Sequence, residues 1–66
     1  MIRRYDVVIE WDPDGHYVGS VRQFPSVRFV GPSPEDVEVE IWEVIWEILR
    51  IDGIPPPEFE LNVTRR

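Results

Sequence analysis

The chain has 66 residues, no cysteine and a formal net charge of -6. This length allows one domain, and the lack of cysteine excludes disulfide bonds and cysteine-ligated metal sites. The acidic balance disfavours general binding to nucleic-acid phosphates, and it favours a basic partner or simply keeps the protein soluble. A domain of this size buries only about 60% of its unfolded surface, so we expect oligomerisation to support its stability.

The remaining composition bears on source and location. The chain contains seven prolines and no lysine. Proline-rich loops are common in thermophile proteins, so we expect a heat-loving source organism. The first residues lack the apolar run of a signal peptide, and no apolar stretch approaches the roughly 18 residues of a membrane span. We therefore expect a soluble cytoplasmic protein that neither enters a membrane nor binds nucleic acid directly.

The first third of the chain has the pattern of a β-hairpin. Apolar and polar residues alternate in residues 3–11 and again in residues 16–22, and the sequence DPDG between them suits a tight turn. Gly19, in the middle of the second expected strand, predicts the close approach of another element. We expect this element to be a helix that packs against Tyr17, Gly19 and Val21.

Residues 33–50 predict the one helix of the chain. Ser33 is a preferred N-cap, Pro34 suits the first helical position, and Asp36 completes a shortened capping box. Gly53, which precedes a triple proline, predicts the stop of the helix.

The order of the expected elements defines the fold. A turn is expected at residues 23–26, a third strand at 27–30 and a fourth strand at 58–63, with residues 64–66 as a frayed tail. The helix between the third and fourth strands is a crossover, which makes the last strand parallel and the connection right-handed. We predict one α+β domain over residues 1–66. Its elements run β-β-β-α-β, and its four-stranded mixed sheet has the order 3-2-1-4 with the helix on one face.

The expected helix carries more apolar surface than a sheet covers. At about 100° per residue, its core stripe comprises Val37, Ile41, Val44, Ile45, Ile48 and Ile51. A second apolar group widens this stripe: Val39, Trp42, Trp46 and Leu49. A surface helix needs a stripe only a little over about 100° wide, so we predict that the second group forms an interface. The alternative is that both tryptophan rings wrap over the flank of their own core.

Several short motifs follow one another along nearly the whole chain. A strand ends in acidic residues, an acidic-glycine turn follows, and a strand of the type Tyr-Val-small-x-Val leads through an apolar-proline turn to a capped helix. The motifs are VVIEWD (7–12), Asp14-Gly15, YVGSV (17–21), Phe24-Pro25, Gly31-Pro32-Ser33 and Glu35-Asp36-Val37. In this order and spacing they resemble the N-terminal domain of HicB-family antitoxins.

The resemblance implies a fold and a function. The fold is a shortened RNase H-like domain with the order β-β-β-α-β. The function is to bind and neutralise a small basic RNA-cleaving toxin, HicA, in a toxin-antitoxin system. Many family members also repress their own operon through a C-terminal DNA-binding segment, but this chain ends at Arg66, so we expect no direct DNA binding. The alternative function is a stand-alone homo-oligomer of the same fold, structural or regulatory, with no toxin partner.

We predict no catalytic, metal or cofactor site. His16 has no second histidine and no cysteine to share a metal ion with. Residues 12–15 resemble the start of a calcium loop, but the twelfth position from Asp12 holds Gln23 in place of the required glutamate. We therefore expect His16 to be an exposed residue at a strand start and residues 12–15 to be a plain turn.

Two charged groups remain. Asp6 and Glu10 share the strand face away from the helix, while Asp36 caps the helix, so we expect a solvated face; a remnant metal-dependent nuclease is the third and weakest hypothesis. Arg3-Arg4 and Arg65-Arg66 flank the two expected parallel strands. Because the pairs then lie at opposite ends of the sheet, we expect them to aid solubility and not to form one nucleic-acid site.

Overall fold

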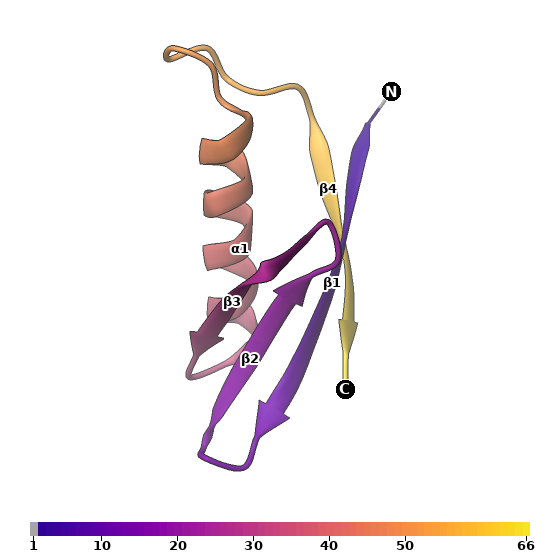
Figure 1. Ribbon diagram of the computed structural model, residues 1–66, viewed down its shortest axis with the longest axis vertical. Coiled ribbons are helices and arrows are strands. Elements are labelled where there is room, and N and C mark those ends of the chain that lie inside the picture. The colour runs from indigo at the N-terminus through magenta and orange to yellow at the C-terminus, as the bar shows by residue number, and fades with distance from the viewer. Residues whose placement is uncertain (1) are drawn as a thin grey trace.

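The computed structural model describes residues 2–66, which form a four-stranded sheet with one helix on one face (Figure 1). In chain order the elements are β1 (Arg3–Asp12), β2 (His16–Val21), β3 (Phe24–Gly31), α1 (Pro34–Leu49) and β4 (Phe59–Arg65). The sheet order is β3-β2-β1-β4, with β1 antiparallel to β2 and parallel to β4. The predicted α+β fold, its element order and its strand order are all confirmed.

The core lies between α1 and the facing side of the sheet. Its buried side chains come from every element except β4: Tyr5, Val7, Ile9, Val21, Phe29, Val37, Ile41 and Ile45. Gly19 lies under the helix, where an added Cβ would stand 2.5 Å from Val37 Cγ1 and 3.0 Å from Ile41 Cδ1. The close approach predicted at Gly19 is therefore confirmed, because only a residue without a side chain fits there.

Ser33 caps the N-terminus of α1 as predicted, whereas the Asp36 carboxylate binds the Ser33 hydroxyl and not the Ser33 backbone N–H of a capping box. The Ser33 hydroxyl accepts a hydrogen bond from the Asp36 N–H at 3.2 Å and donates one to Asp36 Oδ2 at 2.8 Å. These bonds satisfy a donor that the first helical turn would otherwise leave free. Within residues 2–66, no helix combines the length and the apolar composition that crossing a membrane requires.

The C-terminal end of α1 agrees with the predicted range of 33–50, but Gly53 is not the residue that stops the helix. The helix ends at Leu49 with Arg50 as its C-cap, and Gly53 serves a separate turn. Asp52 and Gly53 have positive φ angles of 44° and 81°, and Ile51 and Ile54 exchange backbone hydrogen bonds across them. An Asp-Gly pair is typical of such a two-residue turn, so Gly53 closes this turn instead of the helix.

Two residues assigned to the core stripe of the helix lie outside the core. Ile48 is 52% exposed and Ile51 is 68% exposed. Ile51 follows the helix and sits in the turn, while Ile48 lies on the last helical turn. The stripe therefore packs only as far as Ile45, with Val44 partly buried beside it.

Both outer strands are longer than predicted. β3 starts at Phe24, which pairs with Val21, so the expected turn at 23–26 contracts to Arg22 and Gln23. Pro25 is tolerated because β3 is an edge strand, where a missing N–H breaks no ladder. β4 runs to Arg65, so residues 64–66 are not a frayed tail.

The end of β4 is held by polar contacts. The Arg65 guanidinium bonds to Glu38 at 2.7 Å and to Glu35 at 3.3 Å, both on α1. The hydrogen bond that Arg65 donates to Glu38, followed by the charge of Glu35, raises the pKa of Arg65 above its already high value. The Arg66 N–H donates to the Ile9 carbonyl at 2.9 Å. These contacts join the last residues of the chain to both the helix and β1.

Candidate functional site

The structure separates the four residues predicted to form an interface. Trp42 is 45% exposed and Trp46 is half-buried, and both line one groove beside α1. Val39 is 57% exposed but does not line this groove. Leu49 packs against the core. The two tryptophans thus line the groove, whereas Val39 and Leu49 do not.

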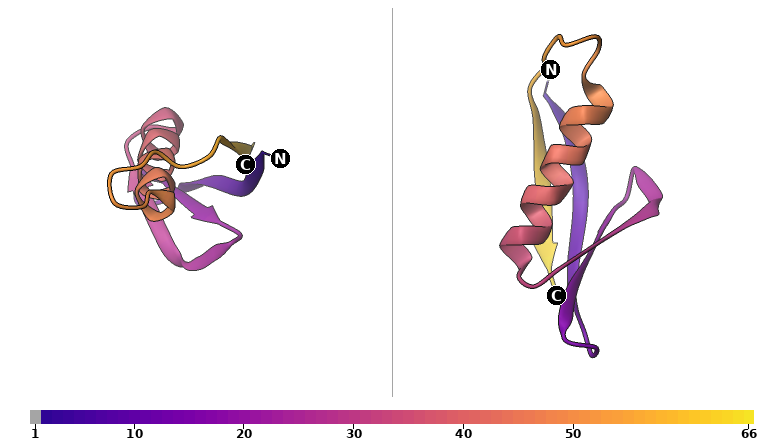
Figure 2. Two further views of the ribbon diagram at one scale, coloured as in Figure 1. Left: turned by 90° about the horizontal axis from the view of Figure 1, so that it is seen from above. Right: turned by 90° about the vertical axis from the view of Figure 1, so that its left-hand side faces the viewer.

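The groove results from the tilt of the helix across the sheet. α1 lies nearest to β2 and β3, and its C-terminal half stands apart from the start of β4 (Figures 1 and 2). The tryptophan side chains reach into this wider space and leave a hollow of about 430 Å³. We call it the Trp42 groove, and it is lined by Ile2, Trp42, Trp46, Pro56, Pro57, Glu58, Phe59 and Glu60.

A row of aromatic rings forms the floor of the Trp42 groove and continues into the core. The Trp42 and Phe59 ring centroids are 5.3 Å apart, with an interplanar angle of 30°. Phe59 packs edge-on against Tyr5 at 6.1 Å, and Tyr5 stacks on Phe24 at 5.7 Å. Trp42 therefore does wrap over the flank of its own core, as the alternative interpretation expected, while almost half of it remains open to solvent.

Charged side chains at the rim of the Trp42 groove are acidic. Within residues 2–66, Glu58 and Glu60 are the charged residues that line it. Glu60 bonds to the Arg4 side chain at 2.7 Å, whereas Glu58 forms no ion pair within residues 2–66. Next to the groove, the Arg50 guanidinium lies 5.8 Å from the centroid of the Trp46 ring. Trp46 and Glu60 are thus each in contact with an arginine of the same chain, Arg50 and Arg4 respectively.

Of the eight residues that line the groove, the sequence analysis predicted two, Trp42 and Trp46. Ile2, Pro56 and Phe59 lie outside the helix, and nothing in the local pattern links them to Trp42. Ile51 and Ile54 were also missed: they flank the Asp-Gly turn and are 68% and 64% exposed. The Asp-Gly pair between two isoleucines is a hairpin-turn signal that would have placed them at an exposed tip.

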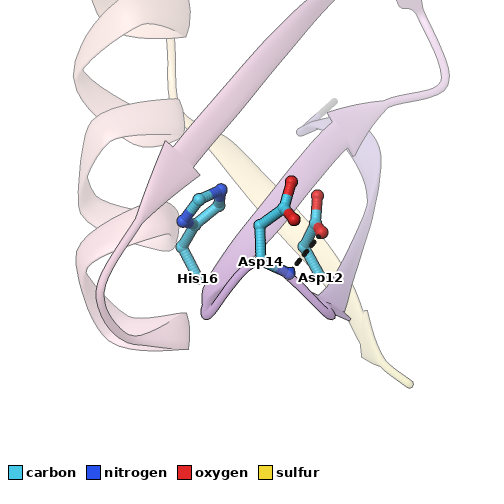
Figure 3. A group of neighbouring side chains, drawn as sticks. All are labelled: Asp12, Asp14 and His16. Atoms are coloured by element: carbon cyan, nitrogen blue, oxygen red, sulfur yellow. Dashed lines mark hydrogen bonds between the residues drawn. The ribbon is translucent and has the colours of Figure 1, made fainter.

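The β1–β2 hairpin gathers three residues that the sequence interpretation treated separately. Asp12 pairs with His16 across the hairpin, so their side chains share a face, and Asp14 lies in the turn between them (Figure 3). One ligand atom from each lies within 4.8 Å of the others. Asp12 Oδ1 accepts the Asp14 N–H at 2.9 Å, and Gly15 has the positive φ angle of 99° that the turn needs. The geometry of the turn therefore explains why aspartate stands at position 12 and glycine at position 15.

The carboxylates considered for nuclease chemistry do not meet. Asp6 and Glu10 lie on the sheet face away from α1, and Asp36 is bound to Ser33 at the helix N-terminus. Asp6 accepts hydrogen bonds from the Asn62 and Gln23 side chains, at 3.1 and 3.2 Å. These bonds, Asn62 first, hold the pKa of Asp6 below its usual value.

The arginine pairs lie at opposite ends of the sheet, as predicted. Arg3 pairs with Phe59 at the start of β4, and Ile9 pairs with Arg65 at its end. Arg4 is bound to Glu60, and Arg66 to Glu10 at 3.1 Å. The four arginines therefore do not form one basic patch.

The comparisons with known proteins add no relative to this picture. No protein-family model, no curated protein and no solved structure matches the chain. The resemblance to HicB-family antitoxins therefore rests on the order and spacing of the motifs in the sequence. The fold that it implies is observed, and the family membership stays a prediction.

Proposed function

We propose that this protein is a HicB-like, antitoxin-type binding module, which neutralises a small basic RNA-cleaving toxin in the cytoplasm by direct contact. It acts by binding and not by catalysis. The motif order of the sequence supports this function, and the β-β-β-α-β fold is the one that the resemblance implies.

The observation that supports the proposal is exposed apolar surface on the helix of an acidic domain. Val39, Trp42 and Ile48 are each 45–57% exposed on a single helix. Exposed apolar groups of this size are typical of protein-binding surfaces. The net charge of -6 favours a basic partner, because opposite charges speed encounter and like charges oppose it.

Coexpression with the neighbouring gene product tests the proposal. We expect a short reading frame beside this gene to encode a basic, histidine-containing protein that arrests growth when it is expressed alone. Coexpression should relieve the arrest, and the two proteins should copurify as one species. An unrelated acidic protein of similar size is the control for net charge alone. A neighbour that stays unbound, or a toxicity that persists, would contradict the proposal.

A homo-oligomer without a toxin partner is the second candidate. It is favoured by Ile48, Ile51 and Ile54, which leave the C-terminal end of α1 and the following turn apolar and exposed. Small domains often gain stability by burying such groups between copies.

Light scattering tests the second candidate. A homo-oligomer should keep its mass on dilution and fall to a monomer in Ile48→Glu, which places a charge on the exposed end of the helix. Val30→Glu, on β3, is a matched change at a 50% exposed residue away from the helix. A wild-type protein that is already monomeric would exclude this candidate.

A further inference from the structure

The Trp42 groove combines an aromatic floor with an acidic rim. Its floor is formed by Trp42, Trp46 and Phe59, with Pro56 and Pro57 beside them. Aromatic grooves of this kind suit aliphatic and proline side chains, which lose little conformational freedom on binding. Glu58 and Glu60 add negative charge at the rim, so the groove suits a ligand that is both apolar and basic.

Two contacts within the chain place a guanidinium group beside the groove. Arg4 reaches Glu60 at 2.7 Å, and Arg50 lies over Trp46 at 5.8 Å. Each is a guanidinium bound to a carboxylate or to an aromatic face. Glu58 lines the same groove with no ion pair within residues 2–66, so it is the carboxylate left for an incoming arginine or lysine.

The position of the groove favours an extended ligand. It follows the start of β4, and β4 is an edge strand of the sheet. The outer N–H and C=O groups of β4 pair with no strand in the described part of the chain. An extended segment beside such an edge gains main-chain hydrogen bonds while its alternate side chains enter the groove.

We infer that the Trp42 groove binds an extended basic segment of a partner protein. An apolar or proline side chain of the segment packs on Trp42 and Phe59, and a neighbouring arginine or lysine pairs with Glu58. This inference rests on the proposed function and locates the contact. A second copy of the chain is a poor occupant, because docking groove against groove brings the two Glu58 carboxylates together on chains of charge -6, and the groove offers neither of them a free cation among residues 2–66.

A synthetic peptide tests the inference directly. The probe is a blocked peptide of alternating arginine, proline and leucine, and its counterpart carries glutamate in place of each arginine. We expect the basic peptide to shift the indole N–H signals of Trp42 and Trp46 saturably in nuclear magnetic resonance spectra. Trp11 is 54% exposed on the β1–β2 hairpin and should not shift, so it is the internal control. Equal shifts from the acidic peptide, or at Trp11, would overturn the inference.

Two variants separate charge from packing. Glu58→Gln should weaken the basic peptide at least threefold, while Glu40→Gln, the same change outside the groove, should leave it unchanged. Trp42→Ala should weaken it at least tenfold; because Trp42 also packs on Phe59, its folding is checked by circular dichroism. If Trp42→Ala unfolds, Glu58→Gln alone decides.

The partner complex distinguishes this inference from the proposed function. If the toxin-like neighbour binds and Glu58→Gln leaves its affinity unchanged, the groove is not the contact and only the inference fails. If the basic peptide binds but no neighbouring toxin does, the proposed function fails and the peptide-binding groove remains.

Discussion

At the residue scale, polar side chains on the open face of the sheet are tied to one another. Asp6 is the centre of one such group. Its carboxylate accepts bonds from Asn62 on β4 and Gln23 in the β2–β3 turn, and its N–H donates to Gln23 Oε1 at 3.0 Å. Alternation in the sequence placed Asp6 on this face, but Gln23 lies 17 positions away. Its role was hidden because a turn residue shows no periodicity.

The titration of Asp6 should reveal this bonding. Because Asn62 and then Gln23 lower its folded pKa, the unfolded chain binds the proton more tightly. Asp6 thus stabilises the fold above the unfolded pKa of about 3.9, and this contribution is lost as pH falls through the lower folded pKa. Carbon-13 spectra of the carboxyl should show an inflection below that of a free aspartate.

Asn62→Ala should raise the Asp6 pKa toward its usual value, because it removes the largest cause of the shift. Thr64→Ala, on the same strand and the same face, is the matched control. An inflection that does not move in Asn62→Ala would show that the bond from Asn62 has no effect on this carboxyl.

At the scale of elements, long-range contacts determine the strand ends that local sequence patterns do not predict. Alternation and capping residues were enough to predict the hairpin, the helix start and the strand order. The predicted start of β3 and end of β4 were wrong because both depend on long-range contacts. Phe24 pairs with Val21 of β2, and Arg65 forms ion pairs with Glu35 and Glu38 of α1. A proline that looks like a turn in sequence is acceptable in an edge strand.

The packing of α1 on β2 gives a quantitative prediction. Gly19→Ala should destabilise the fold by about 1–3 kcal/mol, because the new methyl group overlaps Val37 and the helix must shift. This loss outweighs the preference of a strand for alanine over glycine, which is roughly 0.5–1 kcal/mol. Urea denaturation measures the change.

Two further variants make this test specific. Ser20→Ala, at the neighbouring exposed position, should stay within about 0.5 kcal/mol of the parent protein. Adding Val37→Ala to Gly19→Ala should cost less than the two single changes summed, since it removes the overlapping methyl groups. Additive losses would mean that the two residues do not meet.

At the scale of the whole molecule, β1 is a central strand of the sheet. This strand pairs with β2 on one side and β4 on the other, and Val7 and Ile9 are almost fully buried. The strand order was predictable because hairpins and one helical crossover leave few arrangements. The Trp42 groove was not predictable from the sequence. It depends on the angle at which α1 crosses the sheet, and its lining combines helix residues with Ile2, Pro56 and Phe59.

Hydrogen exchange should be slower in the central strands of the sheet than in its edge strands. The amides of Val7, Val8 and Ile9 should be among the slowest to exchange, near the rate set by global unfolding, because β1, like β2, is paired on both sides. Every second amide of β3 should exchange much faster, since β3 is an edge strand. Mass spectrometry of backbone exchange measures both strands in one experiment. Equal protection of β1 and β3 would contradict the assignment of β1 as a central strand and β3 as an edge strand.

The parallel pairing of β1 with β4 also governs how the protein can be attached to anything else. The described chain starts and finishes at opposite ends of the sheet (Figure 1), and Ile2 lines the Trp42 groove. Seven residues of strand β4 span about 20 Å at roughly 3.3 Å per residue. A fluorophore or affinity tag fused after Arg66 is therefore held that far from the groove, whereas one fused before Ile2 sits at its mouth and competes with the ligand.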